Sequence, residues 1–587
     1  MPNVNAQFGG QTLTQPGSYY VDNVSATAQT GQAQVPPAVV VCNAYGIPPL
    51  VPVTFYTLQD ATNAVKGGPV SAFLPFLYTP STELNGASAV TFINAAQNTQ
   101  ATFPVLNGAP ATAINLTSTQ YGPSANLLQI EIGSGSVGGK YITLLDGYTG
   151  ATVAADNLGL PFQLAYAGTA TGGVTYTVTV AGGVATGLTV TSPNAGESLM
   201  IALGAGQYST VGQVVAYLNG TGFYDAVIWS NPNLPAASLD AAAAVALPIP
   251  ASGVYSYVPV TAKLTDVAYW FNNVASALAT AAVVTGVGGT IANIPLTHFS
   301  GATAVPPTLS NYASALNLAL TQPGWVVFAD ANFAGVAALG AQHAITASAI
   351  PNRRWRRFIT GSQAGDSVAV TVANTAALNA FQATYCYPGL YANSPVTGLN
   401  TLYPGLYVAA ATTGMMAGNP VATALTNKSV IGTGVELIGG LPLSTSQLAL
   451  LQNSGVQTLT VPDSTGVPTI LSDVTTWQND DNPENVFNQQ VGCRQFLSYV
   501  LQQAGAPYIG SIASPFGQRR IKNAFTKALN SMIYTEGGNG VLVSWDPTSL
   551  VLNFTGSNQV ESVTVAVVFV GQVRFLLTTA LVQPLNL

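Results

Sequence analysis

Hydrophobic residues change their spacing along the chain, and each spacing predicts a different kind of element. In residues 36–119, short apolar runs such as 38–41 predict buried strands, which alternate with helix-like pieces. Between residues 120 and 300, runs rich in Val, Thr and Tyr are separated by Gly, Asn, Asp and Ser, a pattern typical of antiparallel strands. We therefore expect a β-rich segment there, with Ala-rich helices near 236–246 and 264–283.

From residue 301 onward, apolar runs that predict strands alternate with helical patterns. Strands that alternate with helices of about ten to fifteen residues indicate a largely parallel sheet covered by helices. We expect strands at 325–330, 356–361 and 458–461, and helices at 334–348 and 375–386. The second half of the chain is thus predicted to contain an α/β domain.

The clearest helical pattern lies near the C-terminus. Apolar side chains recur at helical spacing through residues 521–533 and form one stripe. Gly537 and Gly538 are expected to end this helix. Strands are predicted after it at 541–545, 550–554, 563–570 and 573–577. At the other end of the chain, the first 35 residues are polar, without a helical period, and predict an extended arm.

Charge is scarce and unevenly distributed. Only 6% of the 587 residues are charged, compared with about 25% in a typical soluble domain. Residues 1–352 contain 11 acidic and 3 basic groups, a net charge of −8, whereas residues 353–587 contain 10 acidic and 11 basic groups, a net charge of +1. Disorder requires high charge and low hydrophobicity, so the composition excludes it. A surface with so little charge favours a chain that lies against other protein.

The sequence shows little sign of export, membrane insertion or disulfide bonding. The N-terminal residues have neither a basic segment nor an apolar core, so we expect no signal peptide and a chain that stays where it is made. The apolar stretches 273–296 and 407–425 are diluted by polar residues, and we expect no membrane insertion. Cys42, Cys386 and Cys493 lie far apart and are expected to be buried, reduced thiols.

The sequence contains no motif that supports an enzyme active site. Residues 133–138 match the dinucleotide-binding pattern GxGxxG, but a strand follows them where the mechanism requires a helix, which favours a hairpin turn. His298 and His343 are the two histidines, and no GxSxG motif supplies an activated serine for either. Asp480 and Asp481, with Glu484 nearby, are either a solvated acidic loop or a cation site. We predict no catalytic residues, no metal and no cofactor.

Two basic clusters stand out. Residues 353–357 contain four arginines around Trp355, and this patch favours an intersubunit salt-bridge site over a nucleic-acid site in which Trp355 stacks on a base. The C-terminal helix carries a second cluster: Arg519, Arg520, Lys522 and Lys527. Because the apolar stripe of this helix packs inward, its basic face meets either solvent or an acidic partner, and the sequence favours neither.

Several segments, in order, resemble the contractile tail sheath proteins of myophages. They are LTQPGSYYVDN (13–23), QVPPAVVVCNAYGIPP (34–49), GWVVFADANFAGVAALGAQHAITASA (324–349), LNAFQATYCYPG (378–389), LPLSTSQLALLQNSGVQTLT (441–460), DVTTWQNDDNPENVFNQQVGCRQFLSYV (473–500) and the residues from 518 to 587. The resemblance is weak between 120 and 300, where sheath proteins carry outward-facing insertions. Ser18 stands where the family usually has a hydrophobic residue.

The resemblance implies a subtilisin-like α/β core without catalytic residues, a β-rich insertion, an α+β C-terminal domain and extended terminal arms. The predicted parts are an N-terminal arm (1–35), the first part of the core (36–119), the insertion (120–300), the subtilisin-like domain (301–480) and the C-terminal domain with its closing arm (481–587). We expect a virion protein, assembled in the host cytoplasm into a helical stack of rings. The stack surrounds a tail tube and contracts to drive the tube through the host envelope.

The same resemblance implies roles for particular residues. The arms are expected to donate strands to neighbouring copies through Tyr19, Tyr20, Val21, Val573, Phe575, Leu577 and Leu581. The strand that accepts a neighbour's strand is expected to contain Val563, Val565, Val567 and Phe569. The basic helix is expected to contact the tail tube through Arg519, Arg520, Lys522 and Lys527. Baseplate and tail terminator proteins are the other expected partners, and nucleic acid is not one.

Three alternatives remain open. A type VI secretion sheath fits less well, because that family divides these parts between two chains. A secreted β-rich adhesin or surface-layer protein accounts for the Thr, Gly and Asn content, but it predicts an export signal and no α/β part. A hydrolase on a subtilisin-like scaffold predicts an activated serine near His298 or His343.

Overall fold

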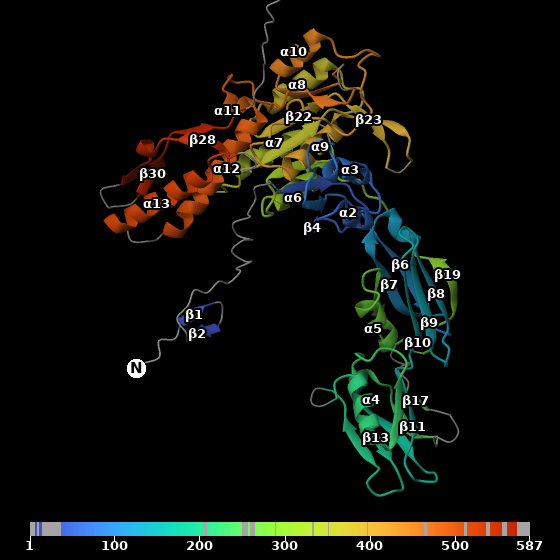
Figure 1. Ribbon diagram of the computed structural model, residues 1–587. Helices are drawn as coiled ribbons and strands as arrows, with labels where there is room; N and C mark the ends of the chain where they lie inside the picture. Colours follow the sequence, from blue (N-terminus) through green and yellow to red (C-terminus); the bar gives the residue numbers. More distant parts are fainter. Residues whose placement is uncertain are drawn as a thin grey trace, which may run out of the picture.

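The chain forms a central α/β core with a C-terminal domain on one side and a long β-rich arm on the other (Figure 1). The structure is a computed structural model. It describes residues 6–8, 11–13, 37–204, 208–248, 256–258, 264–287, 289–331, 334–349, 352–395, 397–462, 466–509, 514–535, 540–554 and 560–571. Near the N-terminus, β1 (Ala6–Phe8) and β2 (Gln11–Leu13) pair antiparallel.

The core is built on one eight-stranded sheet. Its order is β27 (Thr469–Ile470), β26 (Val456–Thr460), β22 (Ala383–Tyr387), β21 (Arg357–Gly361), β20 (Val326–Ala329), β3 (Ala38–Cys42), β5 (Val90–Asn94) and β4 (Pro52–Phe55). The six inner strands run parallel, and the two edge strands run antiparallel to their neighbours. The predicted largely parallel sheet is therefore confirmed.

Helices cover both faces of this sheet, which explains why its strands are apolar throughout. In β3, Val39 and Val41 pack with α6 (Leu309–Ala319) and α7 (Ala334–Ser348). The alternate residues Val40 and Cys42 pack on the opposite face with α3 (Leu74–Tyr78) and α9 (Gly405–Gly418). Helix α9 is apolar on all sides and almost completely buried, as expected of a helix inside a core.

The remaining core elements lie around this sandwich. They are α2 (Leu58–Ala64), the 3-10 turn η1 (Pro69–Phe73), α8 (Val368–Leu378), α10 (Thr445–Asn453) and α11 (Pro483–Val486). A small sheet contains β24 (Asn400–Tyr403), β23 (Leu390–Asn393) and β25 (Gly434–Val435).

The arm is one insertion nested within another, and each unit has its own core. The inner unit contains β6 (Gln100–Leu106), β7 (Thr112–Tyr121), β8 (Leu128–Ser134), β9 (Lys140–Asp146), β10 (Thr152–Leu158), α5 (Thr265–Asn273), β18 (Ala279–Val283) and β19 (Ile294–His298). The outer unit contains β11 (Phe162–Tyr166), β12 (Thr175–Ala181), β13 (Val184–Thr191), β14 (Leu199–Ala202), α4 (Val211–Gly220), β15 (Tyr224–Ile228), β16 (Ala242–Ala246) and β17 (Ser256–Val258). The outer unit lies at the far end of the arm (Figure 1).

The C-terminal domain places two helices against a two-stranded ribbon. Its elements are α12 (Asn488–Gly505), α13 (Pro515–Ser531), β28 (Leu542–Trp545), β29 (Val551–Phe554), β30 (Val560–Thr564) and β31 (Val567–Phe569). β28 pairs with β31 and β29 pairs with β30, both antiparallel. Among the residues placed in the structure, no helix combines the length and apolar character needed to cross a membrane.

Several sequence predictions need correction. The insertion begins about twenty residues before position 120, because β6 pairs with β7, and β7 pairs with β18 of the inner unit and not with the core sheet. The predicted helix at 236–246 contains strand β16, and the one at 264–283 ends at Asn273 and is followed by strand β18. Alanine-rich runs favour helices, but here pairing with neighbouring strands overrides that preference.

Two further elements differ from the prediction. The helix predicted at 375–386 lies earlier, as α8, and its last part is the buried strand β22. Asn379, in a left-handed conformation, ends α8, and this short polar residue was the available signal. The strand predicted at 563–570 is divided into β30 and β31, because the partner strand is interrupted by a turn at Pro547–Ser549.

Helix α7 and strand β21 approach closely at one glycine, which generates a stability prediction. A Cβ atom on Gly340 would lie 2.1 Å from Cζ of the buried Phe358. We expect Gly340→Ala to lower the free energy of unfolding by about 1–3 kcal/mol, since overpacking a core costs that much. Chemical denaturation measures it.

The exposed Ala338 on the same helix supplies the control. Ala338→Ser is expected to change the free energy of unfolding by less than about 0.5 kcal/mol. Equal effects of the two substitutions would contradict the packing described for α7.

Candidate assembly surfaces

The position where α/β proteins usually bind ligands is filled by the chain's own polar groups. The carboxyl ends of β3, β5 and β20 meet where the strand order reverses. There the Asp330 carboxylate accepts the backbone N–H of Asn43 at 2.6 Å and the hydroxyl of Tyr312 at 2.7 Å. Asn94 donates to the carbonyls of Ala44 and Ile47. Burial raises the pKa of Asp330 to about 6. These contacts stabilise the end of β5, from which the chain continues into the arm.

The two histidines lie in different units and do not share a site. His343 is buried in α7, and burial together with the charge of Arg356 lowers its pKa to about 4. His298 lies at the end of β19 in the arm, where Nδ1 is 3.2 Å from the Asn126 carbonyl oxygen and Nε2 is 3.3 Å from the Gln129 amide. Within the described residues, His, Cys, Asp and Glu form no group of three that could hold a metal ion.

The glycine-rich motif at 133–138 is a hairpin turn. It joins β8 to β9, which pair antiparallel, and the Gly135 N–H donates to the Gly139 carbonyl at 2.6 Å. No helix follows the motif to bind a pyrophosphate. The hairpin predicted for this motif is therefore confirmed.

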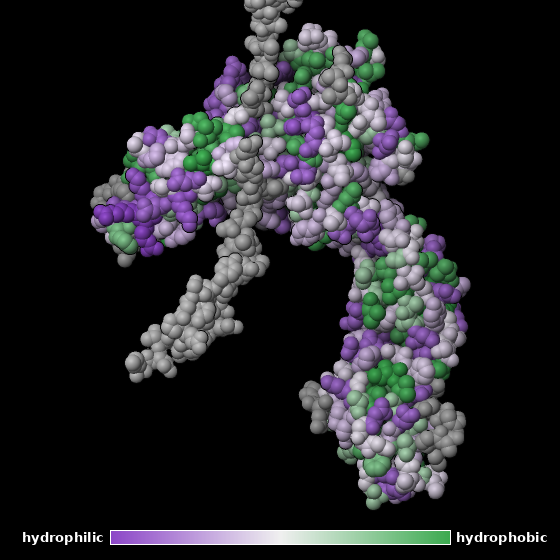
Figure 2. Space-filling view, viewed as in Figure 1, coloured by the Kyte–Doolittle hydropathy of each residue, from purple (hydrophilic) through white to green (hydrophobic). Residues whose placement is uncertain are grey.

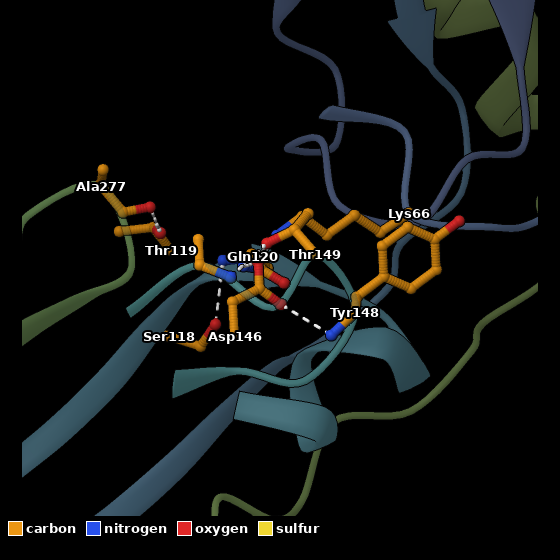
Figure 3. Close-up of polar contacts among 9 residues, drawn as sticks. Lys66, Ser118, Thr119, Gln120, Asp146, Tyr148, Thr149 and Ala277 are labelled. Atoms are coloured by element: carbon orange, nitrogen blue, oxygen red, sulfur yellow. Dashed lines mark hydrogen bonds and ion pairs between the residues drawn. The ribbon is translucent and has the colours of Figure 1, made fainter. Parts of the chain in front are cut away.

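A buried ion pair joins the core to the arm (Figure 3). Lys66, in the core loop after α2, donates to the carboxylate of Asp146, at the end of β9. The Tyr148 backbone N–H and the Thr149 hydroxyl also donate to Asp146, at 3.0 and 2.8 Å. Burial alone would raise the pKa of Asp146, but Lys66 and these two donors lower it below its usual value.

Backbone contacts reinforce this junction. The Gly46 N–H in the core donates to the Tyr121 carbonyl at the end of β7, at 2.7 Å. The Tyr45 ring lies so close to Gly122 that a Cβ there would be 2.8 Å from it. No local pattern in the sequence predicted this junction. The available signal was that Lys66 is one of three basic residues in the first 352.

A buried polar network joins the core to the C-terminal domain. The Arg357 guanidinium and the Thr384 hydroxyl both donate to Oδ1 of Asn488, the first residue of α12. The Asn488 amide donates in turn to Asp473, at 2.8 Å. Burial lowers the pKa of Arg357 to about 10, while the charge of Asp473 opposes that shift.

This network corrects the interpretation of the arginine cluster at 353–357. Arg356 and Arg357 are buried within the chain, with 1% and 6% exposure, so neither reaches a subunit surface. Arg353 and Arg354 are exposed. Only the first half of the predicted intersubunit patch therefore lies on the surface.

The ribbon presents one covered face and one open face. Val563, Val565, Val567 and Phe569 pack against the cluster formed with α12 and α13, although Val565 lies in the short gap between β30 and β31. Side chains on the other face include Val543, Val551 and Val568, which are 57%, 47% and 55% exposed. At the gap, Ser549 Oγ accepts the Ala566 N–H at 2.7 Å, and Asp546 donates its N–H to the Ala566 carbonyl.

One edge of the ribbon, formed by β30 and β31, has no partner strand among the described residues, because β30 pairs only with β29 and β31 only with β28. On the opposite edge, Leu542 of β28 forms backbone hydrogen bonds with Met532 and Tyr534. A two-stranded ribbon with an open edge is a template for a further strand. The predicted arm residues Tyr19, Tyr20, Val21, Val573, Phe575, Leu577 and Leu581 lie outside the described residues, and so does the predicted strand at 573–577.

Helix α13 presents a basic face. Ser514 caps its N-terminus, and Phe525 and Leu529 are its buried contacts. Arg519, Arg520, Lys522 and Lys527 are all exposed. The Arg520 guanidinium lies 5.9 Å from the centre of the Tyr508 ring. In Figure 2, hydrophilic residues gather over this helix.

The acidic loop at 479–484 is also exposed. Asp480 accepts the Trp477 indole N–H at 3.0 Å and the Asn482 backbone N–H at 3.0 Å. Asp481 and Glu484 are exposed, and no ion pair in the described part of the chain involves them. These contacts shape the loop.

Comparison with known proteins agrees with this architecture. No protein-family model matches the sequence. The tail sheath protein of Bacillus phage SP01 is 26% identical over 490 residues, which cover 81% of this chain and 80% of that protein. The chain is a relative of phage tail sheath proteins. The family predicted from the sequence motifs is thus confirmed.

Two solved structures share the sheath fold. A sheath tail protein from Listeria innocua has a TM-score of 0.54 at 10% identity, covering 93% of this chain and 97% of its own. A sheath tail protein from Desulfitobacterium hafniense has a TM-score of 0.52 at 9% identity, covering 92% and 97%. At these identities the likeness concerns the fold alone.

The ion pair between the sheath core and the arm generates a second prediction. Asp146→Asn leaves Lys66 buried without a counter-charge, which costs about 3 kcal/mol. We expect faster hydrogen–deuterium exchange at the Gly46 amide, which spans the junction. Glu83→Gln is the control, because the Glu83–Lys428 pair is about 40% exposed and such pairs contribute about 0–1 kcal/mol.

The Lys66–Asp146 pair makes the free energy of unfolding depend on pH. The pKa of Asp146 is lower in the folded chain than in an unfolded chain, where it is about 3.9. Its stabilisation is therefore complete above that value and is lost as the pH falls through the folded pKa. The stability difference between wild type and Asp146→Asn is expected to shrink below about pH 4. A difference that grows with acid would contradict this assignment.

Proposed function

We propose that the chain is the structural subunit of a contractile phage tail sheath. Copies polymerise helically around the tail tube, and the polymer shortens to drive the tube through the host envelope. The observation that carries this function is the match to a tail sheath protein over 81% of the chain. The two sheath tail proteins that share the fold over more than nine-tenths of the chain support it further.

We propose that neighbouring copies are linked by strand donation, in which one copy adds a β-strand to the ribbon of the next. The ribbon of β28–β31 offers an unpaired main-chain edge beside Val563–Phe569, and its open face carries exposed valines. An extended arm from a neighbour adds main-chain hydrogen bonds there, and those bonds depend little on side-chain identity. Such links persist while the units they join rotate as rigid bodies. The arm residues Tyr19–Val21 and Val573–Leu581 are the proposed donors.

The core provides a rigid body and no chemistry in this proposal. Its subtilisin-like fold serves as a scaffold, and the polar groups at the strand ends bond to one another. No nucleotide is required, because the energy for contraction is stored when the extended sheath assembles. The nested β units extend outward from the cylinder, and baseplate and tail terminator proteins bind its two ends.

The strand-donation step predicts a different outcome for proline than for conservative substitutions. Val21→Pro and Phe575→Pro remove a main-chain donor and are expected to abolish tubes. Val21→Thr and Phe575→Tyr keep the donor and are expected to leave tubes intact. Negative-stain microscopy of purified protein gives the result. Hollow tubes formed by both proline variants would contradict strand donation, and flat lattices or dispersed particles from wild type would contradict the sheath function.

The basic face of α13 is the proposed tail-tube contact. Screenable charge contacts suit a surface that must release its partner during contraction. We expect the double substitution Arg519→Glu and Arg520→Glu to reduce co-sedimentation with the tube about tenfold or more. The double substitution Arg519→Lys and Arg520→Lys keeps the charge and serves as the control. Unchanged co-sedimentation of the glutamate variant would remove α13 from the interface.

A further inference from the structure

A groove runs between the core and α12, in two hollows that share Trp355. The larger hollow has a volume of about 520 Å³ and is lined by residues from the loop 352–356, the segment 322–325 before β20 and the C-terminal half of α12. The smaller, of about 330 Å³, lies between the end of α7 and Arg494 of α12. We call the larger hollow the arginine groove.

The arginine groove is aromatic and basic. Trp325, Trp355 and Tyr499 line it together with Arg353, Arg354 and Arg356. Among the residues placed in the structure, no acidic side chain lines it, and no ion pair involves these arginines. Three cations within four residues repel one another unless an anion lies between them.

Within the arginine groove, the buried guanidinium of Arg356 is the charge that most needs a nearby anion. Its side chain is 1% exposed, and one nitrogen, Nη2, donates to the carbonyls of Leu320 and Gln322. Its Nε and Nη1 atoms are buried and have no hydrogen-bond partner in the described part of the chain. A buried charge without a counter-ion is costly. The groove therefore has a fixed positive charge beneath its floor that an anion from outside can offset.

A second copy carries a matching group of anions. Its loop 479–484 contains Asp480, Asp481 and Glu484, which are all exposed. These carboxylates offer exposed negative charge to the exposed Arg353 and Arg354 of the groove. On its own subunit the end of this loop bonds to α12, where the Asn485 side-chain oxygen accepts a hydrogen bond from the Arg494 guanidinium at 2.8 Å, and none of residues 479–484 lines the arginine groove. The Arg494 guanidinium in turn stacks over Phe381 at 4.5 Å.

We propose that the arginine groove binds the acidic loop 479–484 of a second copy of this chain. The proposal rests on the sheath function and adds a core-to-core contact to the strand links. Because the two patches differ, they can pair head-to-tail, and head-to-tail contacts whose rotation does not close generate open helical arrays. A polyanion such as single-stranded nucleic acid is the other class of ligand for a basic aromatic groove. The net charge of −7 opposes it, while another copy carries its own carboxylates.

A charge swap tests the pairing. The groove variant carries Arg353→Glu and Arg354→Glu, the loop variant carries Asp480→Lys and Asp481→Lys, and the swap variant carries all four. Each of the first two is expected to lower the yield of sedimentable tubes roughly tenfold, because like charges then face each other. The swap variant is expected to restore tubes. The double substitution Arg353→Lys and Arg354→Lys controls for charge. All sites are exposed, and thermal melting checks the fold.

Each outcome decides a different point. Normal tubes from the groove or loop variant, or no recovery in the swap variant, would overturn the pairing and leave the sheath function standing. Absence of tubes from wild-type protein would overturn the sheath function itself. A fluorescent single-stranded oligonucleotide that binds wild type and not the groove variant, without recovery of tubes in the swap variant, would assign the groove to nucleic acid. Weaker assembly at high salt is expected if the pairing is electrostatic.

Discussion

Main-chain hydrogen bonding at one edge of a small ribbon is the interaction on which this account depends. A two-stranded ribbon is marginal by itself and needs a helix or further strands for stability. Here α12 and α13 cover one face, through the inward residues Val563, Val565, Val567 and Phe569. Among the described residues, the edge formed by β30 and β31 has no partner strand, and the valines of the other face are exposed. The low charge of the protein fits such a subunit, because little repulsion keeps copies apart.

Two buried polar connections hold the arm and the C-terminal domain to the core. The Lys66–Asp146 pair fixes the arm to the core, and the Arg357–Asn488–Asp473 network fixes the C-terminal domain to it. Both are buried and draw on residues distant in sequence. A body held in this way moves as a unit. In the proposed sheath, rearrangement therefore falls on the contacts between copies, and the proposed charged contacts at the arginine groove and at α13 change while the proposed strand links remain.

The sequence predicted the elements whose pattern is strong and local. Helix α7 and the parallel strands were found because apolar runs alternate with helical periods, and the 133–138 hairpin because a strand follows its glycines. Predictions that depended on tertiary pairing were wrong: the start of the insertion at 120, the helices at 236–246 and 375–386, the full length of the helix at 264–283, and the unbroken strand at 563–570. Each was decided by a partner strand, which no local pattern reveals.

The candidate functional surfaces also differ in how far the sequence could predict them. The basic face of α13 could be predicted, because an amphipathic stripe places Arg519 to Lys527 opposite the buried side. The arginine cluster was predicted as one surface patch, but Arg356 and Arg357 turn inward, where backbone carbonyls and Asn488 bind them. The Lys66 and Asn488 junctions could not be predicted, since their partners lie 80 and 131 residues away in the sequence.

The central claim is tested most directly by electron cryomicroscopy of the assembled tube. We predict a strand from a neighbouring copy paired with the ribbon beside Val563–Phe569, and arms that cross from each subunit to the next. Arms folded back onto their own subunit, with no strand from another copy beside Val563–Phe569, would contradict strand donation.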